Sequence, residues 1–582
     1  MIAVQQKQRY GQKLFDLIEP AIERAWSSMT GPERSAVSEE LTALAALEPY
    51  GTLYDQACRL AAEVPRRVYS DSAVLLRRMH EVANFGNYQS CLSSLSLVRA
   101  CFELGLVGPD LYVGRGHIAP TFYAERYVRG EFPLAPAMTL HHGGLTGVVH
   151  TDWGFPNTMG YSLGVGLAQA VSRAWDLKQR GIDGKVVCIS GDGELQEGVT
   201  FECLRFVWEH DLTNLVLLID ANGKGIEAFS KPLGTAYLRA FLRPVYEVDG
   251  TDVLPIKAAL NACSTKTSAS AVICRTVKGE HGFRNPNSPP SAPTFSKSAG
   301  AVLSDFQQRH GLRIAVFTAD MAARFGLAGR VPYVNVGLAE TLSVGLASSL
   351  DSSVVKIICT DGKYYMDSLN MLTESAATGQ RVVILAGRNW GAWGGAINAL
   401  NLLALVRHVV VREPITRAEL DAAFEDVLTN PTVTQVVSLS DVHLEPLQID
   451  CSFDLNDGAW LTPPAPGFAK TVIVSFGYAS ALIAEANAGI GLPHLHCAAL
   501  RPRFNPLLLN QLQSFERILT YEYNGTDGGF GQYLRSEYLL PCVVTGVSQV
   551  GTCMHEIQLQ RNGFDRDTLR RKLLSTALEV SA

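Results

Sequence analysis

The sequence lacks the features that mark several large classes of protein. Its 12 cysteines include no C-x-x-C pair and are sparse over 582 residues, which excludes a zinc ribbon or a disulfide framework. Lys and Arg number 50 against 56 Asp and Glu, so there is no basic excess to neutralise a nucleic-acid backbone. No apolar run is long enough to span a bilayer, and no secretory signal is visible. We therefore expect a cytoplasmic protein without nucleic-acid or membrane partners.

The composition is that of a globular protein with several domains. Hydrophobic residues make up 47% of the chain and charged residues 18%, which excludes disordered, collagen-like and coiled-coil chains. A length of 582 residues predicts three to four domains of roughly 150 residues each.

Hydrophobic patterning along the chain predicts an α/β fold. Residues 1–80 have the spacing of amphipathic helices, and short apolar runs then alternate with helical stretches. Strand, helix and strand in succession predict a parallel sheet. Segments rich in Pro and polar residues, at 281–298 and 444–468, separate this region from two further alternating regions. We expect three consecutive α/β domains with mostly parallel sheets, at 1–300 (including an N-terminal helical arm), 301–445 and 446–582.

The strongest local signal is the run GDGELQEG at 191–198, directly after an apolar predicted strand. The next predicted strand is followed by Asn222, 30 residues after Asp192. Because the carboxyl ends of parallel strands meet at one edge of a sheet, we expect these two side chains to lie close together. Their oxygens suit Mg²⁺ or Ca²⁺, and Gly191 and Gly193 let a diphosphate approach the backbone. Gly-Asp-Gly alone is also common in ordinary strand-to-helix turns, and only the full run paired with Asn222 predicts a metal-bridged diphosphate site.

Together with Asn222, the motif resembles the thiamine-diphosphate fingerprint, and GDGELQEG in particular resembles the transketolase family. The resemblance implies a diphosphate-binding, a pyrimidine-binding and a transketolase C-terminal-like domain, in that order. It also implies thiamine diphosphate and Mg²⁺ (or Ca²⁺) as cofactors. The residues implied are the metal ligands Asp192, Asn222 and the Lys224 carbonyl, the diphosphate-binding Gly191, Gly193 and Glu194, and Glu197 at the position that links the two sites of a dimer.

Histidines at three places in the first domain are further candidates. DLYVGRGHIAPTFYA resembles the family's segment ending in Gly-His, which puts His117 on the cofactor or substrate side. LHHGGLTGVVHTDWG lies where the family carries another active-site histidine, so His142 and His150 are candidate catalytic residues. RTVKGEHGF resembles the segment that closes the domain and places His281 near the substrate. For any lone histidine, a structural role is the alternative.

The second essential carboxylate is expected in the middle domain. VPYVNVGLAETLSVGLASSL has an apolar strand, a turn and then Glu340 in the first turn of a helix. An acidic residue there is simply favourable with the helix dipole, but the segment is similar to the family's strand followed by a helix-borne glutamate. The resemblance implies that Glu340 contacts the aminopyrimidine of the cofactor. In CTDGKYYMDSL, Tyr364 is the candidate for the aromatic residue beside the pyrimidine, with Tyr365 as its alternative.

The sequence also departs from the family pattern at positions that face the substrate. A family histidine near the start of the first domain aligns with Asn87, and the middle domain has no histidine in GRNWGAWGGAINALNLLALVR. Arg388 and Arg501 are candidates to bind a substrate phosphate or carboxylate through bidentate contacts, with a solvated surface position as the alternative for each.

The resemblance implies a transketolase-like transferase that moves a two-carbon ketol unit from a ketose, expected to be phosphorylated, to an acceptor. It also implies a homodimer with active sites at the subunit interface. Two alternatives stay open. GHIAPTFYA also resembles homodimeric pyruvate dehydrogenase first components, which implies decarboxylation of a 2-oxo acid and an acyl-carrier partner. The altered histidines are compatible with a non-catalytic relative that only binds the cofactor.

Overall fold

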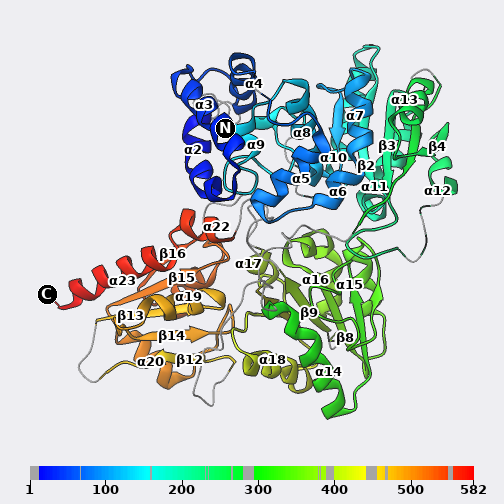
Figure 1. Ribbon diagram of the computed structural model, residues 1–582. Helices are drawn as coiled ribbons and strands as arrows, with labels where there is room; N and C mark the ends of the chain where they lie inside the picture. Colours follow the sequence, from blue (N-terminus) through cyan, green and yellow to red (C-terminus); the bar gives the residue numbers. More distant parts are fainter. Residues whose placement is uncertain are drawn as a thin grey trace. The chain divides into compact units, whose positions relative to one another are not determined.

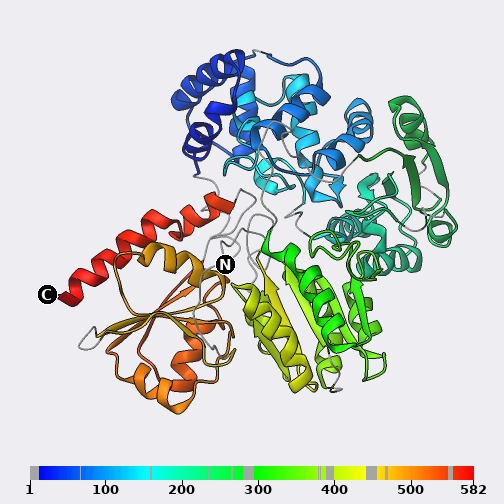
Figure 2. The same ribbon diagram turned by 60° about the horizontal axis from the view of Figure 1, so that its bottom comes forward.

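The computed structural model of the chain is drawn in Figure 1 and, in a second view, in Figure 2. It describes residues 12–581 except 66, 158–159, 161, 230, 232, 234, 264–266, 280–293, 378, 380–381, 388–398, 441–454, 466–469 and 548–554. The described residues form two compact units, one ending before residue 280 and the other beginning at residue 294. Among the described residues, none of the helices combines the length and the apolar character needed to cross a bilayer.

The first unit begins with a helical arm, as the spacing of its apolar residues predicts. The arm consists of α2 (Leu14–Ala25), α3 (Gly31–Ala46) and α4 (Leu53–Glu63). The helices that follow it are α5 (Ser72–Ala83), α6 (Tyr88–Ser93), α7 (Leu95–Glu103), α8 (Ala119–Arg129), α9 (Leu134–Ala137), α10 (Val165–Gln179), α11 (Gly198–Glu209), α12 (Thr235–Arg239) and α13 (Val253–Ala262).

The first sheet contains five parallel strands in the order β1-β2-β3-β5-β4. These are β1 (Leu111–Val113), β2 (Val186–Gly191), β3 (Leu215–Ala221), β4 (Val245–Asp249) and β5 (Ser270–Arg275). Alternate residues of the central strands enter two separate cores: Val187 and Ile189 pack with α5, α7, α8 and α13, while Val186 and Cys188 pack with α10 and α11. Burial on both faces explains why β2 and β3 are almost continuously apolar.

The second unit contains two sheets. The first of them has six parallel strands in the order β10-β11-β9-β8-β6-β7. Its strands are β6 (Ile314–Thr318), β7 (Val334–Asn335), β8 (Val355–Asp361), β9 (Val382–Gly387), β10 (Val409–Arg412) and β11 (Thr434–Leu439). Its helices are α14 (Ala299–His310), α15 (Glu340–Ser348), α16 (Leu369–Ala377), α17 (Ala399–Leu403) and α18 (Arg417–Thr429).

The other sheet of this unit has the order β12-β14-β13-β15-β16, and only β12 runs antiparallel to its neighbour. Its strands are β12 (Ala459–Thr462), β13 (Thr471–Phe476), β14 (His494–Cys497), β15 (Arg517–Glu522) and β16 (Cys542–Gly546). Helices α19 (Tyr478–Asn487) and α23 (Arg566–Ser581) cover one face, as Figure 2 shows, and α20 (Pro506–Gln513) and α21 (Phe530–Tyr538) the other, with α22 (His555–Asn562) preceding α23.

The two sheets of the second unit are joined by backbone and side-chain contacts. Glu413 N–H donates to the Ala498 carbonyl at 2.8 Å, and the buried His496 ring contacts the carboxylate of Glu419, in α18, at 2.7 Å. The predicted fold class, α/β with mostly parallel sheets in succession, is therefore confirmed. The predicted boundaries at 300 and 445 stay predictions, and residue 445 lies outside the described residues.

Candidate functional site

The GDGELQEG run lies at the carboxyl edge of the first sheet. Its first glycine ends β2, and Gly191 pairs in register with Asp220 of β3. Asp192 follows immediately, and its Oδ2 accepts a hydrogen bond of 2.7 Å from the Gly223 N–H. The Asp192 carboxylate therefore contacts the residue next to Asn222, so the two predicted oxygen ligands lie at neighbouring strand ends, as the parallel topology requires.

The polar atoms at this edge fit a divalent cation. Asp192 is only 4% exposed, and burial raises the pKa of its carboxyl group to about 6, although the N–H groups of Gly223 and Gly193 oppose the shift. The Asn222 Oδ1 accepts from the Lys224 N–H at 3.1 Å, whereas its Nδ2 is buried without a hydrogen-bond partner among the described residues. Mg²⁺ and Ca²⁺ take carboxylate, amide and carbonyl oxygens. Asp192, Asn222 and the Lys224 carbonyl are thus the groups that would hold a metal. They include a single carboxylate, and no cluster of three His, Cys, Asp or Glu residues that could hold a metal occurs among the described residues.

The turn after β2 is held by Glu194, which begins the short 3-10 helix Glu194–Gln196. The Glu194 carboxylate is fully enclosed and accepts from the Ser190 hydroxyl and, at 2.8 Å, from the Gly164 N–H. These donors fix the orientation of the Glu194 carboxylate within the motif. The predicted contact of Glu194 with the cofactor stays a prediction. Glu197 is the residue immediately before α11, and its predicted role between the two sites of a dimer stays a prediction.

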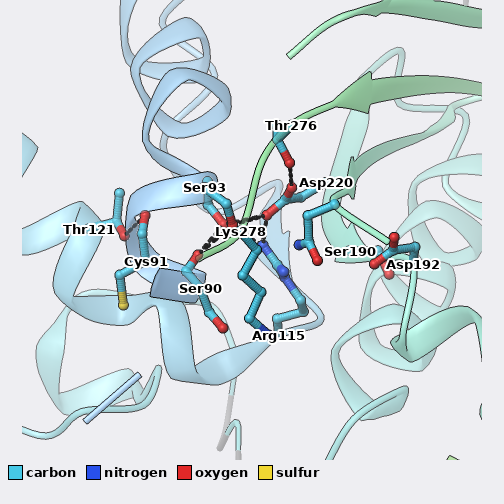
Figure 3. Close-up of polar contacts among 12 residues, drawn as sticks. Ser90, Cys91, Ser93, Arg115, Thr121, Ser190, Asp192, Asp220, Thr276 and Lys278 are labelled. Carbon is cyan, nitrogen blue, oxygen red and sulfur yellow. Dashed lines mark hydrogen bonds and ion pairs between the residues drawn. The ribbon is translucent and has the colours of Figure 1, made fainter. Parts of the chain in front are cut away.

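A buried ion pair lies next to the motif (Figure 3), and the sequence patterns did not predict it. The Arg115 guanidinium contacts the Asp220 carboxylate and the Ser94 hydroxyl. Ser93 and Thr276 also donate to Asp220. Burial by itself would raise the pKa of Asp220, but the charge of Arg115 and these donors hold it below its usual value.

Arg115 contributes more than this ion pair. Its Nε is buried without a hydrogen-bond partner among the described residues, and a Cβ added at Gly191 would lie 2.3 Å from its Cδ. Gly191 is therefore needed where the arginine stem crosses the motif. Lys278, also buried, donates to the Gly225 carbonyl at 2.7 Å. Arg115 directly precedes the Gly-His pair, which is the signal that could have identified it.

The candidate histidines differ in their surroundings. His142 is buried, its Nε2 lies 3.1 Å from the Val82 carbonyl, and burial lowers the pKa of its ring. His117 and His150 are only partly buried. His117 lies in the 3-10 turn Gly116–Ile118, and the His150 Nδ1 accepts from the Asp152 N–H at 3.1 Å. This placement favours a packing role for His142 and leaves His117 and His150 as the more accessible rings; His281 lies outside the described residues.

Glu340 lies at the first position of α15, at 7% exposure. Its Oε1 accepts from the Thr360 hydroxyl at 3.2 Å. Burial raises the pKa of the carboxyl group to about 7, and the charges of Asp367 and Asp361 add to the shift. A carboxyl group with this environment can hold or release a proton near neutral pH, as proton exchange with a ring nitrogen requires.

The two tyrosines of the middle domain are distinguished by burial. The Tyr365 hydroxyl donates to the carbonyls of Ile358 and Leu385, inside the core. Tyr364 is partly exposed, and the Lys363 ammonium lies 4.7 Å from the centre of its ring. Tyr364 is therefore the tyrosine of this pair that has ring surface available for a ligand.

The candidate substrate residues are only partly described. Asn87 immediately precedes α6 and is partly buried. The Arg501 guanidinium lies 5.7 Å from the centre of the Tyr533 ring, and its buried Nε has no hydrogen-bond partner in the described part of the chain. Arg388 lies outside the described residues. The substrate roles of Asn87, Arg388 and Arg501 stay predictions.

Comparison with known proteins shows what the part of the chain that contains the GDGELQEG motif is similar to. Residues 147–306 match the family model of the transketolase thiamine diphosphate binding domain. One of the subunits of an apulose-4-phosphate transketolase from Actinobacillus succinogenes is 28% identical over 246 residues, which are 40% of this chain and 88% of that protein. The 6-deoxy-6-sulfo-D-fructose transketolase subunit SqwG of a Clostridium species is 29% identical over 181 residues, 29% of this chain and 65% of that protein.

The longer relatives are matched over a smaller share of their length. Bovine transketolase-like protein 2 is 30% identical over 213 residues, so that the match covers 33% of this chain and 34% of the bovine protein. Among solved structures, Campylobacter jejuni transketolase is similar over 87% of this chain and 99% of that chain, with 16% identity and a TM-score of 0.42. The residues that match the family model, 147–306, include Asp192 and Asn222.

Proposed function

We propose that the chain is a member of the transketolase family and a thiamine-diphosphate- and Mg²⁺-dependent transferase of a two-carbon ketol unit. The observation that carries the proposal is the meeting of Asp192 and the Asn222 segment at the edge of the first sheet, within the residues that match the thiamine diphosphate binding domain. The donor would be a ketose bearing an anionic group, since two relatives are named for a ketose phosphate and a sulfonated ketose.

Each part of the chain would have a defined role. Thiamine diphosphate supplies the carbanion chemistry when it is bound. Asp192, Asn222 and the Lys224 carbonyl would hold the metal that binds its diphosphate, and Gly193 would let the phosphates approach the backbone. Gly191 would instead leave room for the Arg115 side chain. Glu340 would exchange a proton with the pyrimidine ring, for which its buried, partly protonated carboxyl group is suited. His117 and His150, which are partly buried, would be the histidines on the substrate side of the site.

An assay of the purified chain with thiamine diphosphate and Mg²⁺ tests this function. We expect a ketose phosphate and an aldose acceptor to give a shortened aldose phosphate and a new ketose, without release of carbon dioxide. Pyruvate should not be consumed. Carbon dioxide release from pyruvate without an aldehyde product would instead support the 2-oxo acid reaction with an acyl carrier. Cofactor binding without turnover of either substrate class would support the non-catalytic alternative.

We propose further that the protein acts as a homodimer in the cytoplasm. Two helices on different units carry large exposed apolar side chains: Phe201 and Trp208 on α11, and Leu342 and Leu346 on α15. Exposed groups of this kind are typical of surfaces that become buried on association. Light scattering should give twice the chain mass of 63.1 kDa.

The dimer can be tested by a single change on α11. Trp208→Glu should give a monomer that no longer supports turnover, because the family's sites form between subunits. Leu254→Glu is the matched control, since Leu254 is also exposed but lies on α13, on the other face of the first sheet. A wild-type monomer with full activity would contradict the dimer.

A further inference from the structure

The segment from Leu134 to Asn157 has little regular structure and yet is almost entirely enclosed. Its only regular elements are α9 and the 3-10 turn Thr151–Trp153. Leu134, Leu140, Leu145 and Val149 are fully buried in the core of the first unit. Since buried backbone groups need hydrogen-bond partners, an irregular buried segment depends on its neighbours for its shape. Here the neighbours include all three helices of the arm, together with Val82 of α5 and Arg126 of α8.

Helix α3 fixes the start of the segment through Glu40. The Glu40 carboxylate is 2% exposed and accepts the N–H groups of Leu134, at 2.9 Å, and Ala135, at 2.5 Å. These are the first two residues of α9, whose N–H groups have no carbonyl partner inside so short a helix. A buried carboxylate on two backbone donors therefore holds the position where the segment begins.

Helix α2 fixes the middle of the segment. The Arg24 Nε donates to the His142 carbonyl at 3.0 Å. Two residues further on, the backbone comes so close to α2 that a Cβ at Gly144 would lie 3.3 Å from the Ala21 side chain. The same Cβ would lie 2.3 Å from the Thr139 hydroxyl. The turn that contains His142 thus packs directly on the arm.

Helix α4 fixes the end of the segment, just after His150. A Cβ at Gly154, whose φ is +79°, would lie 2.6 Å from the Tyr54 ring. The Arg126 guanidinium lies 4.4 Å from the centre of the same ring and donates to the carbonyls of Trp153 and Gly154 at 3.1 and 3.2 Å. Tyr54 and Arg126 together hold the turn that His150 begins.

The held segment in turn supports the turn that carries His117. The Val149 N–H donates to the Gly116 carbonyl at 3.0 Å. The backbone of Gly160 lies so close that a Cβ at Gly116 would be 2.2 Å from its carbonyl oxygen. His150 follows Val149, and His117 follows Gly116, so one backbone contact joins the neighbours of both candidate histidines.

We propose that the arm is a built-in part of the substrate site. Glu40, Arg24 and Tyr54 are positioning residues that hold the 134–157 segment. Through this segment they hold His117 and His150 in the geometry needed for ketol transfer. The proposal rests on the proposed function. It gives a role to α2–α4, which precede the residues that match the thiamine diphosphate binding domain. It also separates two tasks, because the arm holds the segment, whereas the Asp192 carboxylate is held by the N–H groups of Gly193 and Gly223.

Two matched pairs of variants test the proposal. Glu40→Gln is compared with Glu39→Gln, the same change at the exposed neighbouring residue. Arg24→Gln is compared with Arg34→Gln, because the Nε of Arg34 also donates to a carbonyl, that of Trp26, which belongs to the arm itself. The readouts are hydrogen exchange of peptides covering 114–120 and 134–157, kcat and KM for the ketose, and the Kd of thiamine diphosphate with Mg²⁺ by calorimetry.

We expect Glu40→Gln and Arg24→Gln to speed exchange in both peptides and to lower kcat by about tenfold to a hundredfold, since small misplacements of catalytic groups cost this much. The Kd of the cofactor should change less than about twofold, as should every readout for the two controls. General destabilisation would instead weaken cofactor binding and turnover together.

The proposal is overturned if the two test variants match their controls in exchange and in kcat, or if they weaken cofactor binding as much as turnover. Should Glu40→Gln not fold, Arg24→Gln, which removes the partly buried bond to the His142 carbonyl, decides alone. If the wild type has no ketol-transfer activity, the proposed function fails in the assay itself. Hydrogen exchange still shows whether the arm holds the segment, so the two failures are distinguishable.

Discussion

Replacing Glu340 by glutamine is expected to reduce ketol transfer at least 10²- to 10⁴-fold, the range for loss of a positioned general acid–base group. Glutamine keeps the size of the side chain and can still accept from the Thr360 hydroxyl, but it cannot exchange a proton. Steady-state rates with saturating cofactor measure the effect. The groups proposed to hold the metal and the diphosphate are Asp192, Asn222 and the Lys224 carbonyl, and the change at Glu340 leaves them intact. The Kd of thiamine diphosphate should therefore change far less than the rate.

The same variant should be more stable than the wild type above neutral pH. Burial raises the pKa of Glu340 from 4.5 to about 7 in the folded protein, so the folded state binds the proton more tightly than the unfolded state. The stability associated with that proton is present at low pH and is lost as the pH rises from about 4.5 to about 7. Glutamine avoids this loss, which is on the order of 3 kcal/mol for such a shift.

Thermal unfolding at pH 5 and pH 8 measures this second effect. The gain in Tm of Glu340→Gln over the wild type should be larger at pH 8. Glu374→Gln is the control, because Glu374, in α16, is an exposed carboxylate of the same unit. Unchanged turnover in Glu340→Gln would show that Glu340 has no proton-transfer role, whatever its stability.

Replacing Asp192 by asparagine is expected to abolish the Mg²⁺-dependent uptake of thiamine diphosphate, with a loss of at least about a hundredfold in affinity. Asp192 supplies the only carboxylate among the three proposed metal ligands, and a divalent cation binds a neutral amide much more weakly than a negatively charged oxygen. The fold should persist, because an amide oxygen can still accept from the Gly223 N–H. Calorimetry with cofactor and Mg²⁺ measures the loss directly.

Asp252→Asn is the matched control for this change. Asp252 also lies in the first unit and accepts a backbone N–H, that of Leu254, but at the exposed start of α13. Its variant should bind the cofactor as the wild type does. If Asp192→Asn bound thiamine diphosphate and Mg²⁺ with unchanged affinity, the proposed metal site at the edge of the first sheet would be wrong.

Sequence patterns were sufficient wherever the relevant residues are close in the chain or lie on consecutive strands. The apolar runs before Asp192 and Asn222 predict two parallel strands, and pairing of those strands brings the two residues together. The position of Glu340 at the start of a helix follows from local spacing in the same way. Periodicity carries this information because it reflects which face of an element is buried.

Patterns failed where burial or distant contacts decide the role of a side chain. Of two adjacent tyrosines, Tyr365 enters the core and Tyr364 stays accessible. His142 and His150 belong to one short stretch, but only His142 is enclosed. No local signal distinguishes the members of these pairs, since the packing partners come from other parts of the chain.

By itself, the sequence determined the α/β class and the placement of Asp192 and the Asn222 segment at neighbouring strand ends. Only the tertiary structure decided that Arg115 pairs with Asp220, 105 residues away, and that Glu40 holds the start of α9, 94 residues away. The physical reason is that strand pairing follows from local periodicity and connectivity, whereas a buried charge finds its partner only after the chain has folded and excluded water from both groups.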